Sequence, residues 1–419
     1  MINSPRIFHG EWWVPAKIVQ KTDSFTTYSM SGKKFTGTLT YNGDSESILE
    51  LYHIPSDFPS TICLENEVMW GKDANGTIYT LFCVSKKEKN KWDFTNTQFS
   101  VEFILIGGHV SSRTEICFES CIVQYPFLRN WAFYYNAPHN HILVDVSMED
   151  GVKWSLRNRV EKQESQYDLT ISRKTEFLIE SLKGLSIDES LEYIREFSQF
   201  LSVALYCEQE PSAVYFVENK TKRILTLLFE QDASVNPKEA KLIGFNELYD
   251  KIPSMLQTWH KNFESLSPIS GYLITSLKKN RYFGAPDFLI IAQALDGYFK
   301  RFIGENINER IRRYEKQIEI LLDRFKDIDA IKKCHIDPVV LKDSRHKYSH
   351  LIPDDESGQA VAGEDLYWLT EKSKILLTCC ILDMLGLSTE EINLCCNNSP
   401  ISKIAEEFET EDWLMGEGG

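Results

Sequence analysis

The sequence predicts an α+β protein of several domains, with a β-rich, sandwich- or barrel-like domain at the N-terminus and an all-α helical bundle at the C-terminus. Two patterns predict this division. Apolar and polar residues alternate before about residue 150, and apolar residues recur at spacings of three and four after about residue 175. A chain of 419 residues is long enough for two or three domains. A hydrophobic content of 42% and a charged content of 26% are typical of globular proteins and exclude extensive disorder.

Residues 1–150 have the pattern of a β-rich domain. The segments FTGTLTY and ESILELYHI alternate, and the turn-forming residues NGDS between them indicate a hairpin. TIYTLFCV, TQFSVEFILIGG and EICFESCIV continue the pattern after short polar breaks. Several short strands in succession, without helical periodicity between them, predict a sandwich or barrel.

Residues 151–250 are predicted to form a mixed connecting region. LEYIREFSQFLSVALY has helical spacing, whereas AVYFVE and RILTLLFE have the character of strands. The polar stretch QDASVNPKEA that follows them is expected to be a loop.

Residues 251–400 are predicted to form the helical domain. Four segments have strong helical periodicity: IPSMLQTWHKNFESL, PDFLIIAQALDGYFKRFI, INERIRRYEKQIEILLDRFK and LYWLTEKSKILLTCCILDMLG. Ser388 and Glu391 form a capping-box pattern that starts one more helix. Four or five helices with short connections favour a bundle. Residues 401–419 are expected to be a frayed acidic tail.

Charge and composition restrict the function. A net charge of −15 argues against broad, sequence-independent binding of nucleic acid. Residues 300–350 nevertheless carry thirteen Lys and Arg against nine Asp and Glu, which fits either a local RNA-binding groove or a solvated helical surface. Without a signal-peptide pattern or an apolar run long enough for a bilayer, we expect a cytoplasmic protein without a membrane association. The cysteines lack metal-binding spacing, so no metal and no cofactor is expected.

The segment VVLKDSRHKYSHLIPDD contains the pair of residues with the clearest chemistry, Arg345 and His350. Cleavage of RNA without a metal needs a base for the 2′-hydroxyl, a cation for the pentavalent phosphate and an acid for the leaving 5′-oxygen. Histidine suits the proton transfers because its pKa lies near neutral pH. Arginine suits the phosphate because its charge is permanent and its guanidinium is a planar fork.

The motif by itself is not specific, since an Arg followed at this distance by a His arises by chance about once in such a composition. Arg345 could instead pair with Asp343 or Asp354, while His350 caps a helix end. A five-residue offset turns by about 140° on a helix, so one copy does not converge on one point. Two copies related by a two-fold axis would build a shared pocket.

The segments FLIIAQALDGYFKRF, KDSRHKYSH and LTEKSKILLTCCILDMLGLSTEEI resemble the Apea-like HEPN domain of bacterial anti-phage proteins. GEWWVPAK, FTGTLTY and PFLRNWAFYY resemble the ApeA-type N-terminal domain that usually precedes it. That family carries an R-x(4–6)-H motif with a polar residue directly after the Arg. Here this residue is His346, where the family more often has Asn.

The resemblance implies a metal-independent endoribonuclease that acts in abortive infection, with transfer RNA as a candidate substrate. HEPN nucleases generally act as dimers with their motifs facing each other, so it also implies a bacterial cytoplasmic homodimer. Arg345 would hold the scissile phosphate, and His350 would be the general base or acid. His346 would orient the phosphate or position His350. Asp296 would orient Arg345, or else be a solvated acid paired with Lys300 at i+4.

Three further hypotheses follow from the two-part layout. The β-rich domain could hold the nuclease inactive until a phage component binds. The HEPN domain could instead be a non-catalytic module that binds RNA or a partner, with the β-rich domain as the recognition element. Finally, the N-terminal tryptophans, among them Trp12 and Trp13, could bind a glycan, although aromatic residues in a β-domain more often fill its core.

Overall fold

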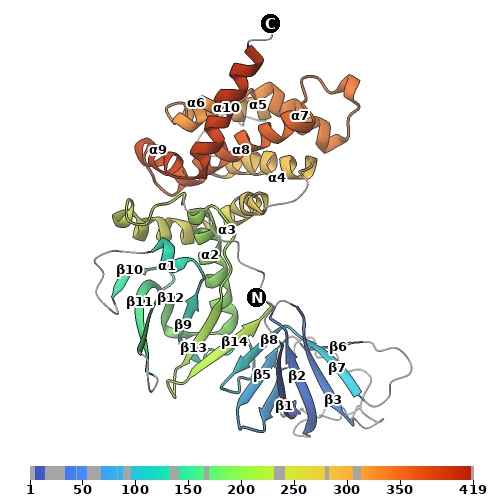
Figure 1. Cartoon of the computed structure of the whole chain (residues 1–419), viewed down its shortest axis with the longest axis vertical. Coiled ribbons are helices and arrows are strands. Elements are labelled where there is room, and N and C mark those ends of the chain that lie inside the picture. Colours follow the sequence, from blue (N-terminus) through green and yellow to red (C-terminus); the bar gives the residue numbers. More distant parts are fainter. Residues whose placement is uncertain are drawn as a thin grey trace, which may run out of the picture.

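The structure of the chain is a computed structural model. It describes residues 5–14, 34–43, 45–53, 68–82, 84–87, 96–132, 141–164, 169–230, 241–278, 283–304 and 313–416, without the side chains of 85–86, 161–164, 169–172 and 409–416. All structural statements below concern these residues. Figure 1 shows three levels along the long axis: strands β1–β8 at one end, a second group of strands in the middle and the C-terminal helices at the other end.

The described strands form one continuous antiparallel sheet of fourteen strands. Its order is β10-β11-β12-β9-β13-β14-β8-β5-β4-β1-β2-β3-β7-β6. The strands are β1 (Arg6–Trp13), β2 (Phe35–Tyr41), β3 (Ser47–Tyr52), β4 (Met69–Asp73), β5 (Ile78–Phe82), β6 (Ser85–Lys86), β7 (Asn96–Val101), β8 (Phe103–Ile106), β9 (Phe118–Gln124), β10 (Ile142–Ser147), β11 (Val152–Glu164), β12 (Leu169–Leu185), β13 (Ala213–Glu218) and β14 (Ile224–Phe229). The expected α+β class is therefore confirmed, and the β-rich part is one sheet.

The sheet has two separate cores. Strands β1–β8 enclose a small core that includes Trp12, Leu39 and Tyr79. Trp12 is fully buried, as expected for an aromatic residue that fills a β-domain core. Strands β9–β14 instead contribute to a much larger core that they share with the helices. The two groups are joined where β14 pairs with β8, with Leu227 opposite Leu105.

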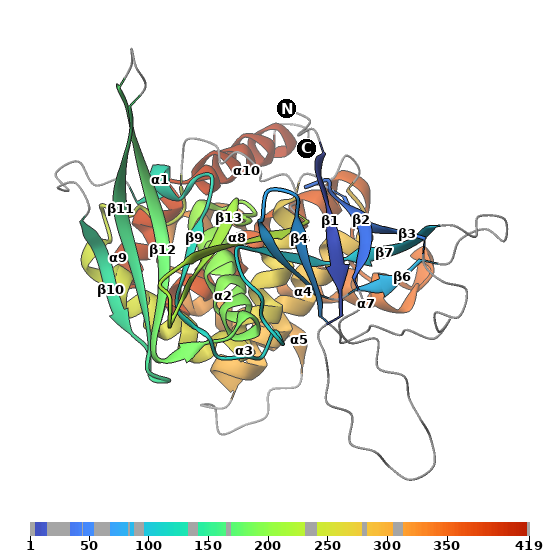
Figure 2. The ribbon, with the colours of Figure 1, turned by 90° about the horizontal axis from the view of Figure 1, so that it is seen from below.

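The sheet continues across residue 150. Strand β10 pairs with β11, with Val146 opposite Trp154, and β12 pairs with β9. Strands β13 and β14, from the region expected to be a connection, also belong to the sheet. Figure 2 shows the long β11–β12 hairpin projecting beyond its neighbours.

Two helices precede the bundle in the described part of the chain. Helix α1 (Leu128–Trp131) is short, and α2 (Ile187–Leu205) starts at a capping box in which Ser186 and Glu189 satisfy each other's backbone N–H groups. Phe197 of α2 stacks on Phe177 of β12 with 3.9 Å between ring centroids, which fixes the helix on the sheet.

The C-terminal bundle consists of helices that surround α8. Its elements are α3 (Ile252–Leu277), α4 (Ala285–Tyr298) with the π-helical turn η2 (Phe299–Ile303), α5 (Tyr314–Arg324), α6 (Asp329–Cys334), α7 (Pro338–His350), α8 (Gly363–Met384), α9 (Thr389–Asn397) and α10 (Pro400–Gly416), with the single turns η1 (Tyr249–Lys251) and η4 (Asp354–Glu356). None of the helices in the described ranges has the length and apolarity needed to cross a membrane.

The tail expected to be frayed is helical from Pro400 onward. Ile401, Ala405 and Phe408 are buried at spacings of four and three, so one face of α10 packs on the bundle. Phe408 lies edge-on against Trp368 of α8. The described part of the tail is thus an amphipathic helix, with Glu406 and Glu407 on its exposed face.

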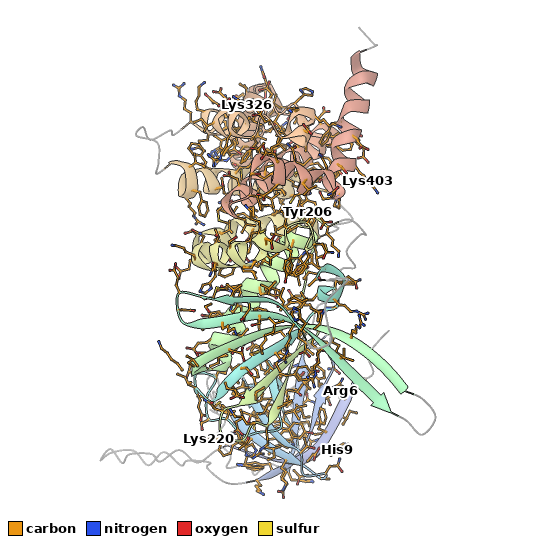
Figure 3. The ribbon with its side chains drawn as sticks, turned by 90° about the vertical axis from the view of Figure 1, so that its left-hand side faces the viewer. Arg6, His9, Tyr206, Lys220, Lys326 and Lys403 are labelled. Atoms are coloured by element: carbon orange, nitrogen blue, oxygen red, sulfur yellow. The ribbon has the colours of Figure 1, made fainter. Side chains whose placement is uncertain are left out.

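Helix α3 packs against both the sheet and the bundle. In its first half, the Trp259 Nε1–H donates to the backbone carbonyl of Glu196 in α2, and Gln257 donates to the carbonyl of Ser147 in β10. In its second half, the carbonyl of Ser276 accepts a hydrogen bond from Lys374 of α8. Pro268 lies between the two halves. In Figure 3, Tyr206 at the end of α2 marks the level at which sheet and bundle meet.

Candidate functional site

The Arg345 and His350 motif lies on the helix α7. The carboxylate of Asp337 accepts hydrogen bonds from the N–H groups of Val339 and Val340, and Pro338 occupies the first turn, so the start of the helix is well capped. The helix ends directly after His350, because Leu351 adopts the left-handed conformation with a φ of 53°. The motif therefore occupies the last turn and a half of a short helix.

Arg345 is held by two other helices. Its Nη2 lies 3.1 Å from Oδ2 of Asp296 in α4. Its guanidinium lies over the ring of Tyr314, the first residue of α5, with 4.6 Å from Cζ to the ring centroid. The Tyr314 hydroxyl donates to the carbonyl of Ala292 in α4. Burial raises the pKa of Tyr314, so this residue stays neutral.

Asp296 is a largely buried acid with two cationic partners. Its side chain is 12% exposed, and the same oxygen accepts from Arg345 and from Nζ of Lys300 at 2.8 Å. Asp296 therefore contacts both Arg345 and Lys300, and it is buried and not solvated. Lys300 is in the π-helical turn η2 that continues α4, and its side chain is 63% exposed. A buried carboxylate between two cations fixes the position of the arginine.

His346 and His350 lie next to each other on the outer face of α7. Their ring centroids are 4.8 Å apart and their planes make an angle of 62°. Both residues are exposed, and within the described parts of the chain neither ring has a hydrogen-bond partner. The i,i+4 spacing brings the rings together.

The arginine and His350 do not converge within one chain. Both lie in one regular helix, so the five-residue offset turns them apart by about 140°. Arg345 points to α4 and α5, whereas His350 lies on the exposed side. The alternative pairing of Arg345 is wrong, because Asp354 pairs with Lys347 and Asp343 pairs with Lys342.

Acidic side chains accompany the cations around α7. Lys342 lies 3.0 Å from Asp343 and 3.6 Å from Glu315. The pKa of Asp343 is below its ordinary value, since the hydrogen bond from the N–H of Gln359 and the nearby Lys342 outweigh the effect of burial. Asp354 raises the pKa of Lys347 through their hydrogen bond. The positive charge of this segment is therefore partly neutralised at the protein surface.

Two family models match the chain. One, ApeA N-terminal domain 1, covers residues 7–259, and the other, Apea-like HEPN, covers residues 289–391. The chain belongs to the ApeA-type HEPN proteins. No curated protein and no solved structure matches it.

The HEPN match includes Asp296 and all of α7, so the four predicted site residues lie inside it. These family matches indicate an anti-phage defence HEPN protein, and HEPN domains are generally nuclease-like. Tyr314 was missed at the sequence level. It is separated from Arg345 by a whole helix, and nothing in its spacing signals the contact.

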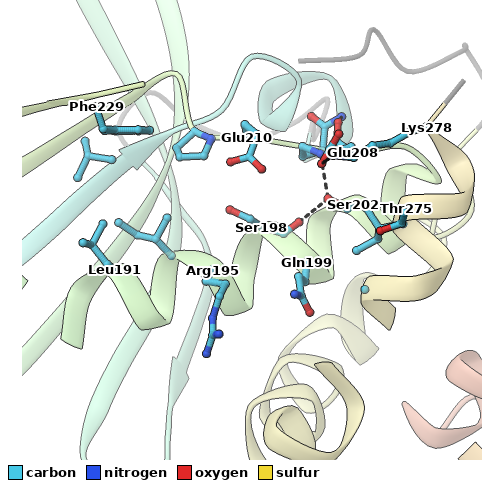
Figure 4. Close-up of a pocket in the computed structure, with 16 residues that line it drawn as sticks. Leu191, Arg195, Ser198, Gln199, Ser202, Glu208, Glu210, Phe229, Thr275 and Lys278 are labelled. Atoms are coloured by element: carbon cyan, nitrogen blue, oxygen red, sulfur yellow. Dashed lines mark hydrogen bonds and ion pairs between the residues drawn. The ribbon is translucent and has the colours of Figure 1, made fainter. Parts of the chain in front are cut away.

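A hollow of about 330 Å³ lies at the edge of the ApeA N-terminal domain, between α2, the end of α3 and the strand β14. Figure 4 shows Leu191 and Ser198 of α2 facing Phe229 and Glu210 across it. Lys278, directly after α3, pairs with Glu208 at 2.5 Å on the same rim. None of the predicted site residues lines this hollow.

Proposed function

We propose that the protein is a metal-independent HEPN endoribonuclease that cleaves host RNA during anti-phage defence. The observation that carries the proposal is the last part of α7, where an arginine fixed by Asp296 and Tyr314 adjoins two exposed imidazoles. The fixed guanidinium suits a phosphate, because it is oriented before the substrate binds. The exposed imidazoles suit proton transfer to and from a bound substrate.

The reaction would proceed by attack of the 2′-hydroxyl on the adjacent phosphorus. One imidazole takes the proton of the 2′-hydroxyl while Arg345 stabilises the pentavalent phosphate. The bond to the 5′-oxygen breaks, and a second, protonated imidazole donates a proton to that oxygen. The products are a 2′,3′-cyclic phosphate and a free 5′-hydroxyl. His350 would supply the base or the acid, and His346 would orient the phosphate or His350.

In a homodimer, Arg345 and His350 would not have to come from the same chain to act on one phosphate, so the angle between them on α7 would not prevent catalysis. With two α7 helices facing each other, the arginine of one chain and the histidines of the other can reach one phosphate. Leu351, directly after His350, supports such a contact. This residue is 87% exposed in a left-handed conformation, an unusual combination for a leucine that contacts only water.

Helix α3 offers a route by which the N-terminal domain could restrain the nuclease until a phage component binds. Its first half packs on α2 and β10, and its second half contacts α8. A shift of the sheet against the bundle would therefore move α3. A substitution in the first half, such as Gln257→Ala in the full chain, would raise basal cleavage if this restraint exists. Unchanged basal cleavage would remove this part of the proposal.

Purified full-length protein, incubated with total RNA and with transfer RNA in EDTA, tests the function. The natural chain should leave 2′,3′-cyclic ends, and His350→Ala should not. His335→Asn is a matched control, because His335 is another exposed histidine of the same domain. Cleavage by His350→Ala at the rate of the natural chain would refute the catalytic assignment.

A non-catalytic HEPN module that binds RNA or a protein partner is the second candidate. The paired cations Lys342 and Lys347 favour the form that binds a protein partner, because a surface whose charges are already neutralised attracts phosphates weakly. Under this reading His350→Ala would leave both RNA binding and the biological effect unchanged. In the catalytic reading the same substitution removes cleavage and leaves RNA binding in place.

A further inference from the structure

The two exposed imidazoles of α7 are arranged like a pair of metal ligands. His346 and His350 are one helical turn apart, with 4.8 Å between their ring centroids. Two histidines at i and i+4 on one helix face are an arrangement with which proteins chelate zinc. Because no hydrogen bond holds either ring within the described residues, both can turn toward a ligand at little cost.

We propose that His346 and His350 form a binding site for a transition-metal cation such as Zn²⁺, and that the bound cation inhibits the enzyme. A zinc ion binds imidazole nitrogens at about 2.0–2.1 Å and takes the lone pair that a general base needs. Metal binding and proton transfer at the same nitrogen therefore exclude each other. The inhibitory half of this proposal rests on the proposed ribonuclease function, whereas the binding half does not.

The cationic side chains around the two rings are paired with carboxylates, among them Lys342 with Asp343, so they oppose a bound metal cation only weakly. Asp343 lies three residues before His346, on the same face of α7, and its pKa is held below its ordinary value. Arg345 is turned away toward Asp296, and Lys347 is paired with Asp354. The described residues contain no cluster of three or more ready ligands, so water would complete the coordination.

Zinc titrations of the metal-free, full-length protein by calorimetry test the binding. His346→Gln and His350→Gln should each weaken Zn²⁺ binding by about 10²-fold, because losing one ligand removes the advantage of chelation. His335→Asn should bind like the natural chain, and all four proteins share the same cysteines. Mg²⁺ should not bind, since it prefers oxygen ligands. Equal zinc affinity in all four proteins would overturn the proposal, as would an equal loss in His335→Asn.

RNA cleavage at increasing Zn²⁺ concentration tests the inhibition separately. The midpoint of inhibition should match the dissociation constant from calorimetry, and EDTA should restore cleavage. Histidine-dependent zinc binding by a chain that cleaves no RNA would support the metal site and refute the proposed function. Cleavage that continues when calorimetry shows the site saturated would refute the inhibition alone.

Discussion

The two ends of the candidate site differ in how firmly they are held. Arg345 contacts a buried carboxylate of α4 and the ring of a buried tyrosine of α5. His346 and His350, on the same helix, lie ring to ring, and neither has a hydrogen-bond partner among the described residues. The difference separates the two chemical tasks of the proposed reaction. The charge that receives the phosphate is oriented in the single chain, whereas the groups that move protons depend on a substrate or a second chain for their orientation.

The largest losses of RNA cleavage are expected when His350 or Arg345 is replaced by alanine. His350→Ala should lower cleavage by about 10²–10⁴-fold, the usual contribution of general acid–base catalysis. It should leave the free energy of unfolding within about 0.5 kcal/mol of the natural chain, as for other exposed side chains.

Arg345→Ala should also abolish cleavage, and it should cost about 1–3 kcal/mol of stability because Asp296 keeps only Lys300. RNA cleavage and urea unfolding measure the two effects. Equal losses of stability in both variants would contradict the comparison.

Asp296→Asn should reduce cleavage by positioning Arg345 less well. We expect about a tenfold loss, and it should fall mainly on the RNA concentration at half-maximal rate, because the guanidinium keeps its charge but loses its orientation. Lys300→Gln is the matched control. Lys300 contacts the same Asp296 oxygen from an exposed position, so its substitution should lower the free energy of unfolding by about 1 kcal/mol or less. A larger loss of RNA cleavage in Lys300→Gln than in Asp296→Asn would contradict the role given to Asp296.

A third histidine shows how a firmly held imidazole should titrate. His260 of α3 has its Nδ1 2.8 Å from Glu196 and its Nε2 3.4 Å from Asp150. The hydrogen bond to Glu196 raises the pKa of His260 above its ordinary 6.5, helped by Asp150 and Glu149 and opposed by burial. Its stabilising contribution is complete below pH 6.5 and is lost as the pH rises through the raised pKa.

The free energy of unfolding should therefore fall by more in the natural chain than in His260→Gln as the pH rises above 6.5. Denaturant unfolding at several pH values measures this difference. Glu196→Gln should flatten the same pH profile, because it removes the strongest partner of the imidazole. Identical pH profiles in all three proteins would show that His260 contributes nothing to the pH dependence of the free energy of unfolding.

The smallest effect is expected at Leu351. Leu351→Gly should raise stability by about 1 kcal/mol or less, because a glycine adopts the left-handed conformation without the clash of a Cβ. If Leu351 lies in a dimer contact, the same variant should dissociate more readily in sedimentation experiments. Lower stability of the monomeric variant would contradict the strain argument.

Much of the fold is predictable from periodicity. The change from alternation to helical spacing predicted the α+β class, and Ser388 does form the predicted capping box with Glu391. The change was placed too early, at about residue 175, because strand β12 continues to Leu185. Strand pairing across residue 150 was not predictable, because periodicity shows that a segment is a strand and not which partner it takes. The segment INERIRRYEKQIEILLDRFK is helical from Tyr314, and the part before residue 313 lies outside the described residues.

For the site, the spacing along the sequence predicted the angle between Arg345 and His350 on the helix. The four-residue spacing of His346 and His350 likewise places their rings side by side. Spacing could not give the burial of Asp296 or the place of Tyr314, since both follow from packing between helices distant in sequence. Asp343 and Asp354 lie closer to Arg345 in the sequence, yet each pairs with a lysine. The catalytic roles of Arg345, His346 and His350 remain predictions.

Helix α3 also bears on how such proteins can exchange parts during evolution. Most of it lies between the two family matches, which end at residue 259 and begin at residue 289. A recombination that joined a new N-terminal domain at residue 251 would separate Met255 and Trp259 from the N-terminal residues that bury them, such as those around Glu196. A crossover near Pro268 would keep each half of the helix with the surface that it matches. Viable hybrids within this family should therefore carry their junctions inside a helix.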